Sequence, residues 1–260
     1  MCEDLTTCFL RDGFVRLDGA VPAELALRCA DLLWAEIGYD PGDPATWVEP
    51  VRWVPGMSSA PFAAAANTPA LVAAFDTLVG TGRWERRASL GSFPLRFPHP
   101  VEPDDAGWHV EGSYQPEGAK SYWLNLSSRG RALLMLFLFS DVGERDAPTR
   151  IRVGSHVDIP PLLVPYGERG VSMFRIAAEI DAASAHRPVA LATGRAGDVY
   201  LCHPFLVHAA QPHHGDRPRF MAQPPLYPAG PLELERPAGD YSPVELAIRE
   251  GLTGSQQATP

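Results

Sequence analysis

The chain has 260 residues, long enough for one large barrel or sandwich with additional helices. Apolar residues make up 45% of it and charged residues 20%, a composition that is ordinary for globular proteins and excludes wholesale disorder. The 22 basic and 31 acidic residues give a net charge of −9. An acidic balance of this size argues against nucleic acid or an anionic membrane as the main partner.

No segment has the pattern of a membrane span or a secretory signal. The longest fully apolar run, from Ala132 to Phe139, has eight residues, whereas a helix needs about 20 to cross a bilayer. The first residues, Met1 to Asp4, include two acidic side chains and lack the apolar stretch of a secretory signal. The sequence therefore predicts a soluble protein of the cytoplasm.

The first third of the chain is predicted to form mainly helices. A short strand is expected at 14–17, followed by a helix over 22–37 whose apolar residues recur at helical spacing. Its buried stripe is predicted to consist of Leu25, Cys29, Leu32, Leu33 and Ile37. Residues 40–60 contain several prolines and glycines and are expected to be a loop, and a second helix is expected over 68–79. That helix is predicted to pack through Leu71, Val72, Phe75 and Leu78.

From residue 87 onward, short β-like runs alternate with proline, glycine and aspartate. The chain contains 27 prolines and 23 glycines, roughly a fifth of its length against an average of about 12%, and their spread predicts many turns between short elements. Eight strands are expected, at 90–97, 106–110, 132–140, 150–153, 189–192, 198–203, 206–210 and 220–224. The predicted fold class is mainly β with flanking helices, arranged as a jelly roll or a related barrel.

We expect a single domain over residues 1–260, because no internal repeat or low-complexity segment divides the chain. Residues 1–86 would form an N-terminal helical layer, residues 87–224 the jelly-roll core, and residues 225–260 a C-terminal extension. The tail after Gly251 is predicted to be frayed.

The sequence has no Walker phosphate loop, no H-E-x-x-H motif and no G-x-S-x-G motif. The informative segment is residues 107–112, Gly-Trp-His-Val-Glu-Gly. In a strand, His109 and Glu111 would project from the same face, about 6–7 Å apart along the backbone. An imidazole and a carboxylate on one face can both reach a single metal ion.

A second informative segment begins with a Gly-Asp turn at 197–198 and continues through an apolar strand. The candidates for a second imidazole ligand are His203, His208, His213 and His214. His203 lies an odd number of residues from His208, so the two would face opposite sides of a continuous strand. His213 and His214 lie in a loop of proline, glycine and aspartate and are expected to face solvent. Two histidines and one carboxylate on one metal, with positions left open, form the facial triad of non-haem Fe(II) oxygenases.

Together these segments resemble the phytanoyl-CoA dioxygenase family of Fe(II)- and 2-oxoglutarate-dependent oxygenases. The resemblance runs from about Phe9 to Pro224. It rests on the opening strand and helix, Arg96-Phe97-Pro98, Trp108-His109-Val110-Glu111, Gly154-Ser155-His156 and the block 197–219. The resemblance implies a double-stranded β-helix (a cupin-like jelly roll) in which His109, Glu111 and His208 bind iron. It also implies that Arg219, eleven residues after His208, binds the distal carboxylate of 2-oxoglutarate, with O2 as the second cosubstrate.

Two departures from the family pattern bear on function. Most members carry aspartate where this chain has Glu111, whose extra methylene moves the carboxylate further from the backbone. The departure argues against a halogenase, which needs a small residue at this position so that halide can bind the iron. Residues 146–153 replace the usual glycine-rich lead into the Gly-Ser-His turn, which suggests a rim shaped for a different substrate.

Further charged side chains near these motifs have their own expected roles. Arg96 is expected either to meet an anionic substrate or to form a structural ion pair. His156 is expected to stabilise its turn rather than to bind metal. Arg217 is expected to remain in a turn, whereas Arg219 leads into an apolar strand.

The sequence thus predicts an enzyme, a non-haem iron 2-oxoglutarate-dependent dioxygenase with no catalytic side chains beyond the metal ligands. The resemblance implies hydroxylation of an unactivated C–H bond of a small metabolite or natural-product intermediate, with release of succinate and CO2. The same site would also serve desaturation, cyclisation or epimerisation, and a vestigial cupin-like binding protein is the alternative from another class. A small molecule is the expected partner, selected by loops 40–60, 112–130 and 157–187, and the oligomeric state stays open.

Overall fold

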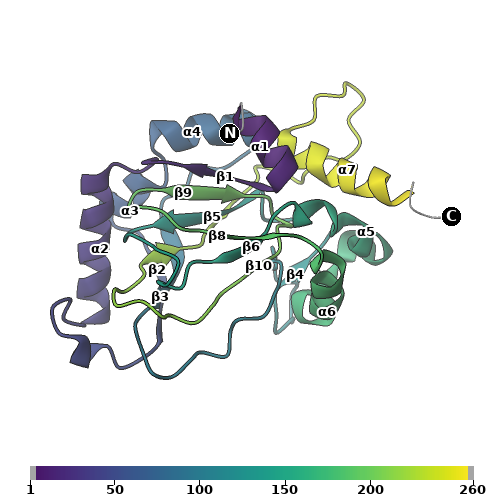
Figure 1. Cartoon of the computed structure of the whole chain (residues 1–260). Helices are drawn as coiled ribbons and strands as arrows, with labels where there is room; N and C mark the ends of the chain where they lie inside the picture. Colours follow the sequence, from purple (N-terminus) through teal and green to yellow (C-terminus); the bar gives the residue numbers. More distant parts are fainter. Residues whose placement is uncertain (1–3, 257–260) are drawn as a thin grey trace.

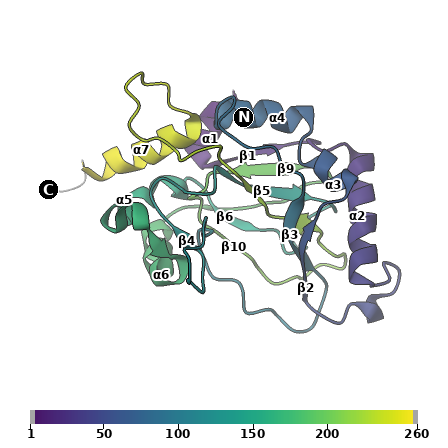
Figure 2. The ribbon, with the colours of Figure 1, turned by 180° about the vertical axis from the view of Figure 1, so that it is seen from behind.

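Antiparallel β-sheets flanked by helices make up a computed structural model that describes residues 4–256 (Figures 1 and 2). In the largest sheet, β9 (Val199–Cys202) lies between β1 (Phe14–Leu17) and β5 (Leu133–Leu138). On its other edge, β5 pairs with both β11 (Met221–Ala222) and β12 (Pro225–Leu226). Strands that are far apart in the sequence are therefore neighbours in this sheet.

Smaller sheets complete the β structure. A three-stranded sheet consists of β10 (His208–Ala209), β6 (Arg150–Arg152) and β8 (Val189–Leu191), with β6 in the middle. Two further pairs join β2 (Val51–Met57) to β3 (Leu90–Arg96), and β4 (Trp123–Leu124) to β7 (Val171–Ser172). The β3 strand also runs beside the chain around β11, so the β2–β3 pair lies next to the largest sheet.

The strand β5 is buried on both faces, and each face lines a different part of the core. The even-numbered side chains from Leu134 to Leu138 pack in a cluster with Ile151 of β6. The odd-numbered side chains from Leu133 to Phe137 belong to a larger cluster that includes the helical residues Leu33 and Phe75. Because successive side chains of a strand point to opposite faces, one apolar run holds the three-stranded sheet on one side and the helices on the other.

Helices lie around the sheets on three sides in Figure 1. On one side are α2 (Ala23–Ile37) and α3 (Ala60–Ala65), and along the top are α1 (Leu5–Asp12), α4 (Pro69–Leu78) and α7 (Pro243–Gln256). At the end opposite α2 are α5 (Pro160–Leu163) and α6 (Met173–Ser184). None of the helices within residues 4–256 is both long and apolar enough to cross a membrane.

Most of the predicted elements are confirmed. The helices expected over 22–37 and 68–79 are α2 and α4, and the predicted stripe of α2 is buried except for Leu32, which is half-buried. The side chain of Thr68 caps α4 by accepting a hydrogen bond from the Leu71 N–H at 3.4 Å. Each predicted strand contains an observed one, with the exception of 106–110.

Two of the predictions for irregular and extended segments are wrong. The expected loop 40–60 contains β2, although Pro55 and Gly56 disfavour a strand. Among the described residues β2 pairs with β3 alone, and an edge strand tolerates proline because no ladder bond is lost on its free side. The expected strand 106–110 makes a single bridge, at His109, since Gly107 lies within the segment and weakens strand pairing.

The chain is helical beyond Gly251, as far as Gln256, so the prediction of a frayed tail is wrong over the residues that the structure describes. Ser242 and Glu245 form a capping box at the start of α7: the Ser242 Oγ accepts from the Glu245 N–H at 3.3 Å, and the Glu245 carboxylate accepts from the Ser242 N–H at 2.9 Å. A Cβ on Gly251 would lie 2.5 Å from the Val157 carbonyl oxygen. Glycine therefore allows α7 to pack closely rather than ending it.

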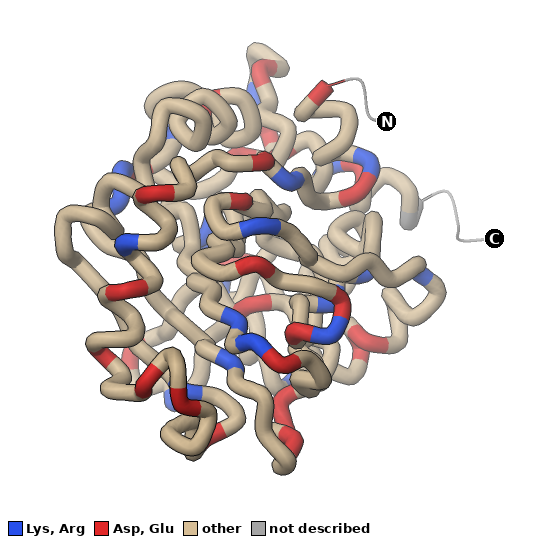
Figure 3. Tube along the Cα trace, turned by 60° about the vertical axis from the view of Figure 1, so that its left-hand side comes forward, with Lys and Arg blue, Asp and Glu red and all other residues tan. Residues whose placement is uncertain are grey.

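Charged residues are interspersed over the molecule. Figure 3 shows acidic and basic positions alternating across the view rather than gathering on one element. Several form local ion pairs, such as Arg16 with Asp18 at 2.7 Å and Arg175 with Glu179 at 3.4 Å. Exposed pairs of this kind contribute at most about 1 kcal/mol each, so the fold depends mainly on its apolar clusters.

Candidate metal centre

Two histidines lie directly opposite each other across an antiparallel bridge. The His109 N–H donates to the His208 carbonyl at 3.0 Å, and the His208 N–H donates to the His109 carbonyl at 3.0 Å. Residues that exchange both bonds in this way carry their side chains on the same face, and the two imidazole centroids are 4.5 Å apart. The bridge therefore brings together two segments that are far apart in the sequence.

Each imidazole is oriented by the backbone two residues before it. Nδ1 of His109 lies 2.9 Å from the Gly107 carbonyl oxygen, and Nδ1 of His208 lies 3.0 Å from the Leu206 carbonyl oxygen. Because a carbonyl only accepts, Nδ1 carries the proton in both rings and Nε2 presents a lone pair. This is the usual support of a metal-binding histidine.

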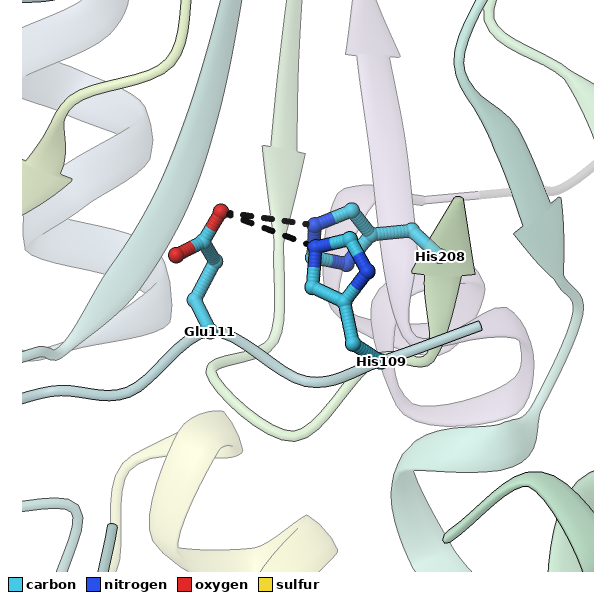
Figure 4. A group of neighbouring side chains, drawn as sticks. All are labelled: His109, Glu111 and His208. Carbon is cyan, nitrogen blue, oxygen red and sulfur yellow. Dashed lines mark ion pairs between the residues drawn. The ribbon is translucent and has the colours of Figure 1, made fainter. Parts of the chain in front are cut away.

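Glu111 completes the group shown in Figure 4. Its Oε1 lies 3.9 Å from Nε2 of His109 and 3.7 Å from Nε2 of His208. One ligand atom of each residue lies within 4.8 Å of the other two. Two donors bound at about 2 Å to one ion, at right angles, lie about 3 Å apart, so small side-chain rotations would close the group on a metal. Two imidazoles and one carboxylate are the donor set of the 2-His-1-carboxylate iron site.

The three side chains are coupled electrostatically. Burial alone would raise the pKa of Glu111, but the neighbouring imidazoles of His109 and His208 and the charge of Arg131 hold it well below its usual value. Burial lowers the pKa of His208, and the neighbouring His109 lowers it further. Burial also acts to lower the pKa of His109, but the neighbouring Glu111 carboxylate more than offsets this, so that pKa is raised. The carboxylate is ionised near neutral pH, as a metal ligand must be.

The group opens into a cavity of about 300 Å³. Two arginines on the same cavity are paired by a second bridge, in which the Arg96 N–H donates to the Arg219 carbonyl at 3.0 Å and the Arg219 N–H donates to the Arg96 carbonyl at 2.8 Å. Two reciprocal bridges thus place two histidines and two arginines along one cavity.

Arg219 is a buried cation without a counter-ion. Its side chain is 1% exposed, and its guanidinium donates to the carbonyls of Ala147 at 2.6 Å and Pro94 at 3.0 Å. Its Nε has no partner, and no carboxylate lies within ion-pair distance of it in residues 4–256. Burial and the nearby charge of Arg96 lower the pKa of Arg219. An uncompensated buried charge is costly, so this end of the cavity suits an anion.

Arg96 differs from Arg219 because a carboxylate accompanies it. Its guanidinium forms an ion pair with Asp105, which also lines the cavity. Of the two expectations for Arg96, the structural ion pair is therefore present. One Asp105 oxygen and the Arg96 Nε are buried without a partner, so the pair retains hydrogen-bonding capacity.

The other histidines lie apart from this group. His203 is fully buried and donates from Nε2 to the Val244 carbonyl at 3.2 Å, and His156 is fully buried with Nε2 3.1 Å from the Leu10 carbonyl oxygen. Neither lines the cavity. The two loop histidines differ in exposure, since His214 is exposed as expected but His213 is half-buried.

Acidification below pH 6.5 is expected to destabilise the fold through His156. Burial lowers the pKa of His156 to about 4, against about 6.5 in the unfolded chain. Between these values the unfolded chain binds a proton that the native chain does not, so the free energy of unfolding falls as the pH drops through this window. Urea unfolding at pH 7 and pH 5 measures the effect. His156→Gln should weaken the pH dependence, and His186→Gln, at an exposed position, should preserve it. An unchanged pH dependence in His156→Gln would contradict this account.

Two of the three loops expected to select the substrate reach the cavity. Trp53, from residues 40–60, and Met173, from residues 157–187, both line it. Residues 112–130 instead line a separate cavity of about 560 Å³.

The sequence analysis missed two charged residues at the site, Asp105 and Arg131. Asp105 lies in an acidic loop and Arg131 lies just before an apolar run, and charged residues at both kinds of position usually face solvent. Their residue type was therefore the only signal in the sequence for a place at the site.

Solved structures with similar folds provide an independent comparison. The chain matches SnoN, a non-heme α-ketoglutarate-dependent epimerase from nogalamycin biosynthesis, with a TM-score of 0.56 and 20% identity over 84% of this chain and 79% of SnoN. It matches HygX from Streptomyces hygroscopicus, solved with nickel and 2-oxoglutarate bound, with a TM-score of 0.55 and 20% identity over 86% of this chain and 85% of HygX.

The non-heme α-ketoglutarate-dependent carbocyclase SnoK from the same biosynthesis matches with a TM-score of 0.54 and 16% identity, over 88% of this chain and 84% of SnoK. No protein-family model and no curated protein matches the chain. At these identities the comparison establishes the fold: a mainly β arrangement of antiparallel sheets with helices, shared with these enzymes.

Proposed function

We propose that the protein is an Fe(II)- and 2-oxoglutarate-dependent oxygenase of the kind found in the phytanoyl-CoA dioxygenase family, built as one jelly-roll domain. His109, Glu111 and His208 would hold the iron, and Arg219 would bind the distal carboxylate of 2-oxoglutarate. The observation that carries the proposal is that one cavity holds both a two-histidine, one-carboxylate group and a buried arginine without a counter-ion. The fold likeness to SnoN and HygX supports it.

The residues of the chain have separate tasks in this proposal. Iron with 2-oxoglutarate and O2 supplies the oxidising power for attack on a C–H bond, with release of succinate and CO2. His109, Glu111 and His208 would hold the metal and leave it open positions for the cosubstrates. Arg219 orients the dicarboxylate through its guanidinium, which matches a carboxylate geometrically. Trp53 and Met173 line the cavity and would contact the substrate. No side chain has to act as a general base.

Hydroxylation of a small metabolite or natural-product intermediate is the main reaction that we propose. A second outcome at the same site is favoured by the neighbours in fold, since SnoN is an epimerase and SnoK a carbocyclase. Both outcomes use the same metal ligands. The placement of the substrate C–H bond relative to the metal decides between them. A binding protein with a vestigial site remains the alternative from another class.

The test is succinate formation by the purified chain with Fe(II), 2-oxoglutarate and O2 but no substrate. An oxygenase should release succinate slowly, and a metabolite that fits the cavity should accelerate release. Product analysis of that metabolite then separates hydroxylation from epimerisation and cyclisation. Binding of Fe(II) and 2-oxoglutarate without succinate in the presence of the whole metabolite panel would favour the binding protein.

Shortening or removing the Glu111 carboxylate should have graded effects. Glu111→Asp keeps a carboxylate at shorter reach and is expected to retain partial succinate formation, whereas Glu111→Ala is expected to lose most of it. The side chain is half-buried at the metal group, so neither change removes a core contact. Succinate release and iron content are measured on the same samples. Full activity in Glu111→Ala would remove this residue from the ligand set.

A further inference from the structure

The segment that carries His109 has little backbone support. From residue 98 to residue 108, no backbone group bonds to another backbone group within the described part of the chain. The single bridge of residues 106–110 is the one that joins His109 to His208. Ordering an extended segment costs conformational entropy. Side-chain contacts must therefore hold this segment where it delivers a metal ligand.

One guanidinium connects this segment to the one that carries His208. Arg150, on β6, donates from Nη2 to the Ala106 carbonyl at 2.6 Å, three residues before His109. The same guanidinium donates to the Ala210 carbonyl, two residues after His208, from Nη2 at 2.9 Å and from Nε at 3.1 Å. Bonds from an ionised donor are stronger than neutral ones, and the planar fork fixes their directions. Arg150 therefore ties together the two segments that the reciprocal bridge joins.

The indole of Trp108 provides a second contact with β6. The guanidinium carbon of Arg150 lies over this ring, 4.7 Å from its centroid, and that of Arg152 lies 4.3 Å from the centroid. Arg152 is itself held by Asp181 of α6, donating to its backbone carbonyl and to its carboxylate, each at 2.7 Å. A cation over an indole face is attracted to it. Both arginines belong to residues 146–153, the segment that departs from the family pattern.

We propose that Arg150 is a positioning residue for the metal group: its guanidinium holds the segments of His109 and His208 together, so that both imidazoles face one ion. The inference rests on the proposed metal site and adds a residue that does not itself bind the metal. The strand β6 holds the second histidine through its ladder, in which His208 pairs with Ile151. It holds the first through the Arg150 side chain, which reaches Ala106. Arg150 does not line the cavity, so direct contact with a cosubstrate or substrate there does not fit.

Such a tether has a physical reason in this chain. The two imidazole centroids are 4.5 Å apart without any ion between them. A site arranged before the ligand arrives spends less free energy on ordering when the ligand binds. Without the tether, ordering residues 106–110 would be charged to metal binding. Residues that orient metal ligands without binding the metal typically change metal affinity by about 10- to 100-fold when they are mutated.

The experiment measures Fe(II) affinity of the full chain by anaerobic calorimetry, without 2-oxoglutarate. Arg150→Met should weaken Fe(II) binding by about 10- to 100-fold. Arg187→Met is the matched control, because Arg187 is a half-buried arginine whose ion pair is with Asp158, away from the cavity. It should bind Fe(II) like the wild type. Failure of the wild type to bind Fe(II) would overturn the proposed function, whereas equal binding by wild type and Arg150→Met would overturn this inference alone.

Amide hydrogen exchange of the metal-free protein separates positioning from a general structural role. In Arg150→Met, exchange should become faster in peptides that cover residues 106–112 and 207–211, and should stay at the wild-type rate in α2 and β5. Faster exchange in all of these peptides would show a general loss of stability and would overturn the inference. If Arg150→Met does not fold in a thermal unfolding test, both measurements are made on Arg150→Lys. That variant keeps the charge but lacks the fork, and an Fe(II) affinity equal to that of the wild type would also overturn the inference.

Discussion

Replacing Arg219 by alanine is expected to raise the 2-oxoglutarate concentration needed for half-maximal succinate formation by about a hundredfold or more. A carboxylate at this end of the cavity would otherwise be buried without a counter-ion, and losing one partner of a buried charge pair costs about 3–5 kcal/mol. Each ~1.4 kcal/mol corresponds to a factor of ten in affinity. Because Arg219 already donates to two carbonyls, its guanidinium is held in place before any ligand arrives.

Arg217→Ala is the control for this prediction. Arg217 is exposed, with 66% of its side chain accessible, and it does not line the cavity. Its removal should leave the 2-oxoglutarate dependence nearly unchanged. Iron content is measured in both variants, so that loss of metal is not mistaken for loss of cosubstrate binding. Equal small effects in the two variants would remove Arg219 from the site and weaken the case for 2-oxoglutarate.

Sequence patterns predicted the parts of the fold that depend on local apolar spacing. The helix α2 was predictable because its buried residues recur at helical spacing, and the strand β5 because it is a short continuous apolar run. The strand β2 was not, since Pro55 and Gly56 conceal it, and its stability comes from pairing with a strand that lies much later in the chain. The capping box of Ser242 and Glu245 was a local signal for the start of α7, and α7 continues through Gly251 to Gln256.

The candidate site was predictable only in part. The spacing of His109 and Glu111 predicted a shared face, but the choice of His208 over His203 depended on the family resemblance. The structure supplies the physical reason for that choice, since the reciprocal bridge sets His208 beside His109, whereas His203 packs under α7. The bond of Arg131 to the Gly112 carbonyl depends on how two segments of the chain pack, and no spacing within the sequence encodes it.

Removal of either histidine is expected to abolish tight Fe(II) binding. His109→Ala and His208→Ala each delete one of three ligands, so the loss should exceed the about 10- to 100-fold that follows when a residue only supports a ligand. One reciprocal bridge places the two imidazoles side by side. Each leaves its Nε2 free to bind the metal, because its Nδ1 bonds to a backbone carbonyl. Anaerobic calorimetry with Fe(II) measures the affinity, and iron content after gel filtration provides a second measure.

His203→Ala is the control that decides whether the right histidine was chosen. His203 is fully buried and bonds to the Val244 carbonyl on α7, so its replacement leaves a polar group unsatisfied and should lower the free energy of unfolding by about 1–3 kcal/mol. Fe(II) affinity should stay at the wild-type value, because His203 does not line the cavity. Stability and metal affinity therefore respond to different histidines. Full metal occupancy in His208→Ala, together with its loss in folded His203→Ala, would show that the second imidazole ligand is His203.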